Sequence, residues 1–186
     1  MARIRKKKTR EIAVPSEPAI APFRARELQE LWLRLAGEEW SSLVVIPASP
    51  EGSTVDFACS LADIGSTLSD HAVSAVTVTE IAPGSARALA ALADDVRRRQ
   101  KRLQEGHAVE GGEDAPEDRD ASMIIGSAGR IIIGVPSVIA TPVSLAVAQA
   151  ADLIVLGVEM GRTNTKDVKR SIELIGRERV AGCVLL

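Results

Sequence analysis

Short aliphatic runs, each followed by a turn and then a helical pattern, constrain this chain more than any other feature. The clearest is "SLVVIP" at residues 42–47, which leads into a segment of Pro, Gly, Ser and Thr before a new apolar pattern begins at helical spacing. Similar runs stand at residues 72–79, 130–136 and 152–158 and at the end of the chain. Continuous apolar runs are typical of parallel strands buried on both faces. The alternation predicts an α/β fold, with a doubly wound, mostly parallel sheet and helices on both faces.

Helical patterns fill the segments between these runs. Aromatic residues make up only 2% of the chain, so the core is expected to consist of Ala, Val, Ile and Leu. Pro83 and Gly84 mark the turn into the longest helix. The predicted helices cover residues 22–37, 54–69, 85–104, 142–151 and 164–176.

Two segments stand outside this pattern. Residues 1–20 begin with "MARIRKKKTR", which holds six basic residues and no acid, and they predict a flexible basic arm. Residues 105–120 are acidic and almost free of apolar side chains, which predicts a mobile surface loop. The remainder, 21–186, is long enough for one domain with a buried core.

Composition excludes several classes of protein. A net charge of −2 makes no case for nucleic acid as a partner. No apolar stretch is long enough to cross a bilayer, so we expect a cytoplasmic protein. Cys59 and Cys183 stand among apolar residues and are expected to be small core residues without a disulfide. His71 and His107 stand alone, so no metal site is expected.

The segment "SPEGSTVD" after the first strand has the outline of a phosphate-binding loop. Gly52, Ser53 and Thr54 offer a small backbone, a hydroxyl and a helix start. The lysine of such a loop is missing, because no lysine stands between Lys8 and Lys101. Two interpretations follow: a residual nucleotide or anion site, or a simple helix cap with Asp56 in the first turn. We favour the cap.

The other strand ends repeat this loss. Phosphoryl transfer needs carboxylates that hold Mg²⁺ at strand ends. The second strand ends in Thr79, and only Glu80, one position later, offers a carboxylate. The strand "RIIIGVPSV" ends in Gly134 and is followed by Pro136. No catalytic residue and no bound cofactor are therefore expected.

These segments together resemble the bacterial tyrosine autokinases, which belong to the deviant P-loop ATPases and act beside membrane chain-length regulators in capsule and exopolysaccharide export. The similarity covers most of residues 22–186 and is strongest in "IIIGVPSVIATPVSLAVAQAADLIVLGVEMGRTNTKDVKRSIELIGRERVAGCVLL". "SPEGSTVDFACSLA" is similar to the family's phosphate loop, and "PFRARELQELWLRLA" to its opening helix. The resemblance implies a P-loop NTPase-like fold. It also implies that Arg162, after "EMG", contacts a phosphate, although a turn and helix cap is the interpretation we prefer.

The chain departs from this family at its functional positions. The family's loop lysine corresponds to Ser53, and its two strand-end aspartates correspond to Thr79 and Gly134. The tyrosine-rich tail has no counterpart, since the chain contains no tyrosine. Arg24 stands within the family's ring-assembly motif, but Ala21 and Glu27 do not match it. A scaffold that keeps its pattern and loses its chemistry is typical of a binding protein.

Candidate partner contacts lie near the N-terminus. Arg5, Lys6, Lys7 and Lys8 could meet an anionic membrane surface or an acidic partner, and a solvated tail is the alternative. Arg24 is a second candidate. Trp40 is a third, because tryptophan is enriched at binding hot spots.

Two functional hypotheses follow. The first is a non-catalytic, kinase-like accessory protein in exopolysaccharide synthesis or export. It would bind an inner-membrane chain-length regulator or a related kinase, with peripheral membrane contact through the basic arm. The alternative is an ATP-binding tyrosine kinase or ATPase with a rearranged site, which would use ATP and Mg²⁺.

Overall fold

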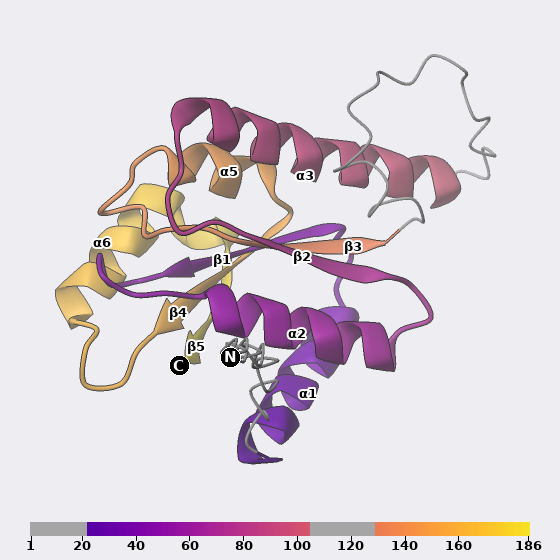
Figure 1. Ribbon diagram of the computed structural model, residues 1–186, viewed down its shortest axis with the longest axis horizontal. Helices are drawn as coiled ribbons and strands as arrows, with labels where there is room; N and C mark the ends of the chain where they lie inside the picture. The colour runs from indigo at the N-terminus through magenta and orange to yellow at the C-terminus, as the bar shows by residue number, and fades with distance from the viewer. Residues whose placement is uncertain (1–21, 105–128) are drawn as a thin grey trace, which may run out of the picture.

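The computed structural model of the protein describes residues 22–104 and 129–186 (Figure 1). Its five strands form one sheet in the order β2-β3-β1-β4-β5, and every neighbouring pair is parallel. The predicted parallel α/β sheet is confirmed. The strands are β1 (Ser42–Pro47), β2 (Val73–Thr77), β3 (Arg130–Gly134), β4 (Leu153–Val158) and β5 (Val180–Leu185).

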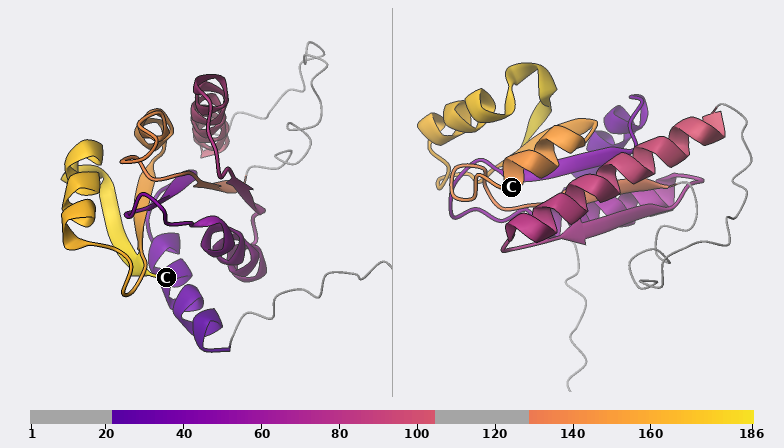
Figure 2. Two further views of the ribbon diagram at one scale, coloured as in Figure 1. Left: turned by 60° about the vertical axis from the view of Figure 1, so that its left-hand side comes forward. Right: turned by 90° about the horizontal axis from the view of Figure 1, so that it is seen from above.

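Helices cover both faces of the sheet (Figures 1 and 2). One face carries α1 and α2, and the opposite face carries α3, α5 and α6, so the fold is doubly wound. The helices are α1 (Pro22–Ala36), α2 (Val55–Leu68), α3 (Pro83–Gln104), α5 (Ser144–Ala150) and α6 (Thr165–Ile175), with a 3₁₀ turn at Arg177–Arg179.

The core has two layers, one on each face of the sheet. All six residues of β1 are buried, as expected for the central strand of a sheet with two covered faces. Val44 and Ile46 face α3 and α5, whereas Leu43 and Val45 face α1 and α2. Alternation along one strand therefore supplies both layers.

Gly65 allows α1 to pack closely on α2. Trp32 of α1 is 1% exposed, and its ring atoms lie 2.7 Å from the position that a Cβ of Gly65 would take. Any larger residue at position 65 would collide with the buried indole.

The expected boundaries of three elements need correction. The longest helix, expected at 85–104, begins at Pro83, so Pro83 and Gly84 are its first residues and not the turn before it. The strand expected at 72–79 is paired only over Val73–Thr77, because its neighbour β3 ends at Gly134, opposite Thr77. The helix expected from 142 begins at Ser144, because the preceding turn is closed by tighter i→i−3 bonds, such as Leu145 N–H to Pro142 C=O at 3.0 Å.

The expectation that both cysteines are core residues is wrong. Cys59 lies on α2 outside the buried stripe, and Cys183 lies on the edge strand β5, where alternate residues are exposed. Both thiols are free and exposed, and burial on one side raises the pKa of Cys183.

The arm at 1–20, the acidic segment at 105–120 and the run "SMIIG" at 122–126 lie outside the described residues. In the part of the chain that is described, no helix is both long and apolar enough to span a membrane.

Candidate functional site

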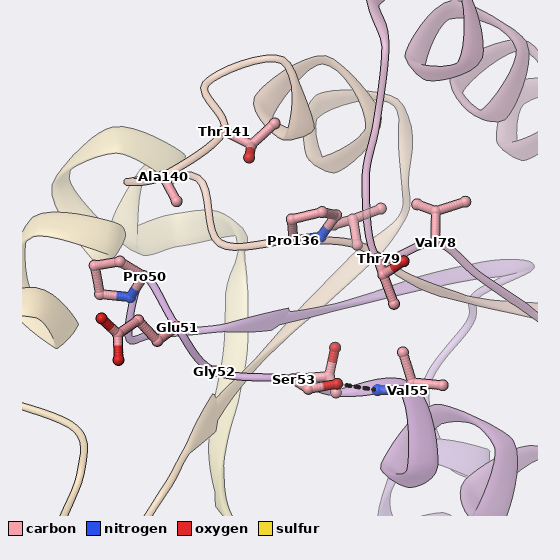
Figure 3. A pocket seen from close by; sticks show the side chains of 12 residues that line it. Pro50, Glu51, Gly52, Ser53, Val55, Val78, Thr79, Pro136, Ala140 and Thr141 are labelled. Atoms are coloured by element: carbon pink, nitrogen blue, oxygen red, sulfur yellow. Dashed lines mark hydrogen bonds between the residues drawn. The ribbon is translucent and has the colours of Figure 1, made fainter.

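A cavity of about 250 Å³ opens at the carboxyl ends of β1, β2 and β3. β1 and β3 are neighbours whose following helices lie on opposite faces of the sheet, and such switch points are where α/β proteins bind ligands. Figure 3 shows that three loops contribute to its wall. The lining residues are Pro50, Glu51, Gly52, Ser53, Thr54, Val55, Val78, Thr79, Val135, Pro136, Ala140 and Thr141.

The loop after β1 is tight because Gly52 has no side chain. A Cβ at this position would lie 2.6 Å from Ser49 Oγ and 2.8 Å from Pro47 Cβ. The Gly52 N–H donates to the Ser49 carbonyl at 3.2 Å, and the Ala48 N–H donates to Gly157 C=O at 2.8 Å. The backbone after β1 is therefore held as a compact turn against β4.

Helix α2 begins directly after this turn. Thr54 occupies the N-cap position, but its buried hydroxyl donates to the Val45 carbonyl at 3.2 Å instead of capping the helix. Ser53 Oγ accepts a hydrogen bond from the Val55 N–H at 3.4 Å (Figure 3). Asp56 stands in the first turn, where a carboxylate is favourable. The hydroxyl that meets a backbone N–H at the start of α2 is therefore that of Ser53, not that of Thr54.

Glu159 is the residue of this site that sequence reasoning missed. Its Oε1 accepts a hydrogen bond from the Ser53 N–H at 3.1 Å, and its side chain is only 19% exposed. The Glu159 N–H donates to Thr163 Oγ1 at 2.8 Å, which fixes the start of the loop after β4. The available signal was an acid immediately after the strand at 152–158, at the edge where strand ends meet.

Glu80 and Arg162 do not join the cavity wall. Glu80 is exposed, and its neighbour Thr79 lines the cavity instead. Arg162 has a side chain that is 83% exposed, and its guanidinium lies 3.6 Å from Glu159 Oε2. Arg162 is linked to this site through its ion pair with Glu159, whereas Gly52, Ser53 and Thr54 all line the cavity.

Gly134 leaves little room for the aspartate that the family resemblance would place there. A Cβ at this buried position would lie 3.0 Å from Thr77 Cγ2 and 3.4 Å from Ala58 Cβ. A carboxylate extending beyond that Cβ would be buried without a partner, which is costly. The packing of β3 against β2 and α2 suits glycine.

The electrostatics of the cavity are unsuited to a triphosphate. Among its described lining residues the single charged side chain is the carboxylate of Glu51, and no lysine or arginine is present. Several negative charges placed close together need cations or metal ligands to offset their repulsion. In the described part of the chain no group of three or more His, Cys, Asp or Glu is arranged to hold a metal ion.

Trp40 is not a surface anchor, which corrects the expectation that it contacts a partner. Its side chain is 3% exposed, its Nε1–H donates to the Leu35 carbonyl at 2.8 Å, and its ring meets that of Trp32 edge-on at 5.8 Å. Arg24 lies in α1, but its side chain is outside the described set. Arg5, Lys6, Lys7 and Lys8 are likewise outside the described residues.

Comparison with known proteins supports the fold. No protein-family model and no curated protein matches the chain. Among solved structures, the chimerical protein CapA2B2 is similar at 14% sequence identity, with a TM-score of 0.54 over 91% of this chain and 86% of that chain. A likeness at this identity concerns the backbone arrangement alone. The shared arrangement is an α/β fold, and in this chain a cavity lies at the carboxyl ends of the parallel strands.

Proposed function

We propose that this protein is a non-catalytic, kinase-like accessory component of capsule or exopolysaccharide synthesis. It would act by binding a membrane chain-length regulator or a kinase partner. The observation that carries the proposal is a cavity at the nucleotide position of a P-loop-like fold whose described wall contains no cationic side chain.

The contact between Glu159 and the loop supports a non-catalytic role. Phosphate-binding loops use their backbone N–H groups to receive the phosphate oxygens. Here the Ser53 N–H already donates to Glu159 Oε1 at 3.1 Å. A protein carboxylate therefore takes one of the donors that a phosphate would need, and its negative charge repels an incoming anion.

Two further lines connect the chain to capsule synthesis. The sequence resembles the bacterial tyrosine autokinases over most of its length, and its fold is shared with the chimerical protein CapA2B2. The sequence resemblance supports the pathway and the shared fold agrees with it, while the missing lysine and the packing at Gly134 support a role without phosphoryl transfer.

A small apolar area at the ends of β4 and β5 is the partner contact that we propose. Met160 is 73% exposed and Leu185 is 70% exposed. The two lie near each other, because Leu185 pairs with Val158 and Met160 follows two residues later. Large apolar side chains exposed beside an open sheet edge are typical of protein contacts.

Two measurements test the proposal. Titration of the purified chain with a fluorescent ATP analogue should show no saturable binding with or without Mg²⁺. Micromolar, Mg²⁺-dependent binding would instead establish the nucleotide-binding alternative.

Co-purification of the tagged chain from its native host should recover a membrane chain-length regulator or a kinase. Met160→Glu should reduce that recovery. Leu33→Glu is the matched control, because Leu33 is 64% exposed on α1, outside the proposed contact. Recovery of neither partner, or equal effects of both variants, would contradict the proposed role.

A further inference from the structure

A second cavity, of about 440 Å³, lies at the opposite edge of the sheet, where β1, β3 and β4 begin. Its wall is made by the end of α1, the residues before β1, the C-terminal half of α3, the first residue of β3 and the residue before β4. We propose that this cavity binds a carboxylate that carries a neighbouring N–H donor, as an acidic amino acid residue does. The inference is independent of the proposed function, since it concerns other residues.

Arg130 provides the anion-binding group. Its guanidinium carbon lies 4.6 Å from the centroid of the Trp40 ring and 5.9 Å from that of Trp32. Stacking on an aromatic face leaves the N–H groups at the guanidinium edge free to donate in the plane. Within the described residues, no carboxylate pairs with Arg130, and burial lowers its pKa. A half-buried guanidinium without a carboxylate partner is stabilised most by a planar oxyanion.

The other cations of the cavity wall, Arg97 and Lys101, both have partners of their own, which makes Arg130 the group available. Arg97 donates to Asp152 and to the Ala150 carbonyl, and it also approaches Asp94 at 3.4 Å. Asp152 in turn accepts from the Ser41 and Ser42 N–H groups. Arg97 and Asp152 thus form an internal pair that closes one wall, and neither needs a ligand.

Gln100 supplies the second recognition element. Its side-chain Oε1 is fully buried and has no hydrogen-bond partner in the described part of the chain. A buried acceptor without a donor is unfavourable, so a rotation of the Gln100 side chain that brings Oε1 to a ligand N–H in the cavity is favoured. Because Gln100 and Arg130 line the same cavity, one ligand with a carboxylate and an amide N–H satisfies both.

The acidic residues in the wall select a singly charged ligand. Glu38 and Glu39 also line the cavity, and both are exposed. Their charges repel a doubly charged phosphate more strongly than a single carboxylate. The structure therefore favours an acidic amino acid, free or within a peptide, over a phosphate ester.

The two tryptophans provide a direct readout. They are the only two in the chain, and both contact the Arg130 guanidinium. Titration of the full chain with N-acetyl-aspartate amide should give a saturable change in tryptophan emission. The same titration with N-acetyl-asparagine amide, which lacks the charge, should give none. A capped peptide with two adjacent aspartates and free aspartate are then compared. Tighter binding of the peptide identifies a peptide ligand, and tighter binding of free aspartate identifies a free acidic amino acid.

Two substitutions locate the site. Arg130→Gln should weaken binding of N-acetyl-aspartate amide by about tenfold or more, the loss expected for a charge-assisted hydrogen-bonded pair. Arg98→Gln is the matched control, because Arg98 is exposed on α3 outside the cavity wall, and it should leave the affinity unchanged. Gln100→Leu should weaken N-acetyl-aspartate amide more than acetate, which has no N–H.

Three outcomes would overturn the proposal: no saturable binding of either carboxylate probe, equal losses in the Arg130→Gln and Arg98→Gln variants, or tighter binding of inorganic phosphate than of the carboxylates. Arg130→Lys keeps the test decisive if Arg130→Gln does not fold. That variant retains the charge without the planar fork and should still bind more weakly than the parent chain.

Discussion

The carboxylate of Glu159 is bound to the backbone of Ser53, with Oε1 accepting the Ser53 N–H at 3.1 Å. The two residues are far apart in sequence and meet because β4 lies directly beside β1. This bond joins the loop after β4 to the loop that precedes α2, and it occupies one backbone N–H group next to the N-terminus of α2.

Glu159→Ala should lower the free energy of unfolding by about 0.5–1.5 kcal/mol, because one partly shielded hydrogen bond is lost and the Ser53 N–H turns to water. Urea denaturation measures this change. Glu173→Ala is the control, since Glu173 pairs with Arg170 on an exposed surface of α6. Its effect should stay below about 0.5 kcal/mol. Equal losses in the two variants would show that the Glu159 contact contributes no more than a surface ion pair.

Gly65→Ala should destabilise the protein even though alanine favours helices. The new Cβ would lie 2.7 Å from ring atoms of the buried Trp32, and overpacking of this kind costs about 1–3 kcal/mol. Gly84→Ala is the opposite case, because no atom lies within 4 Å of the position that a Cβ would take there, in the first turn of α3. It should stabilise by up to about 1 kcal/mol. Thermal unfolding of the two variants should shift in opposite directions.

Asp152 should give the pH dependence of stability an acid limb, which is a fall in the free energy of unfolding as the pH decreases. Burial by itself raises the pKa of Asp152. The N–H groups of Ser41 and Ser42 and the Arg97 guanidinium lower that pKa by more than burial raises it, so the net pKa lies below the ordinary value. A carboxylate with a depressed pKa stabilises the fold above its unfolded pKa, about 4, and this stability is lost as pH falls through the folded pKa.

Asp152→Asn should therefore flatten the loss of stability below about pH 4, while it destabilises the neutral protein by about 1–3 kcal/mol. Urea midpoints measured across this pH range test both effects. Asp63→Asn, at an exposed position of α2, is the control and should leave the acid limb unchanged. An unaltered acid limb in Asp152→Asn would contradict this assignment.

Cys59 and Cys183 should both react with Ellman's reagent in the folded protein, because both thiols are exposed. The pKa of Cys183 is raised by burial, so its reaction rate should continue to rise at a pH where a free thiol has reached its plateau. A Cys59→Ser variant isolates the Cys183 reaction. Reaction of fewer than both thiols without denaturant would contradict the exposure of the two cysteines.

The sequence predicted the sheet because its strands are continuous aliphatic runs, and this signal is local. β1 is buried along its whole length, as "SLVVIP" indicates. The same local reasoning missed Glu159, because its role depends on β4 lying beside β1, which only the strand order decides. It misplaced Trp40 for a related reason, since two neighbouring glutamates indicate exposure while contacts with Trp32 and Leu35 bury the ring.

Cys183 shows a different limit. An apolar run at the chain end predicts a strand, and β5 is one, but a run gives no information on whether the strand is central or at an edge. At the edge strand β5, one face of the sheet is not fully covered, so alternate side chains are exposed to solvent.

The packing around Gly134 limits which substitutions this fold can accept. An aspartate there would bring its Cβ to 3.0 Å from Thr77 Cγ2, so Thr77 has to shift or become smaller before a carboxylate is accommodated. The direct route to a strand-end carboxylate at position 134 therefore passes through a less stable protein, and selection for a folded chain favours keeping glycine there.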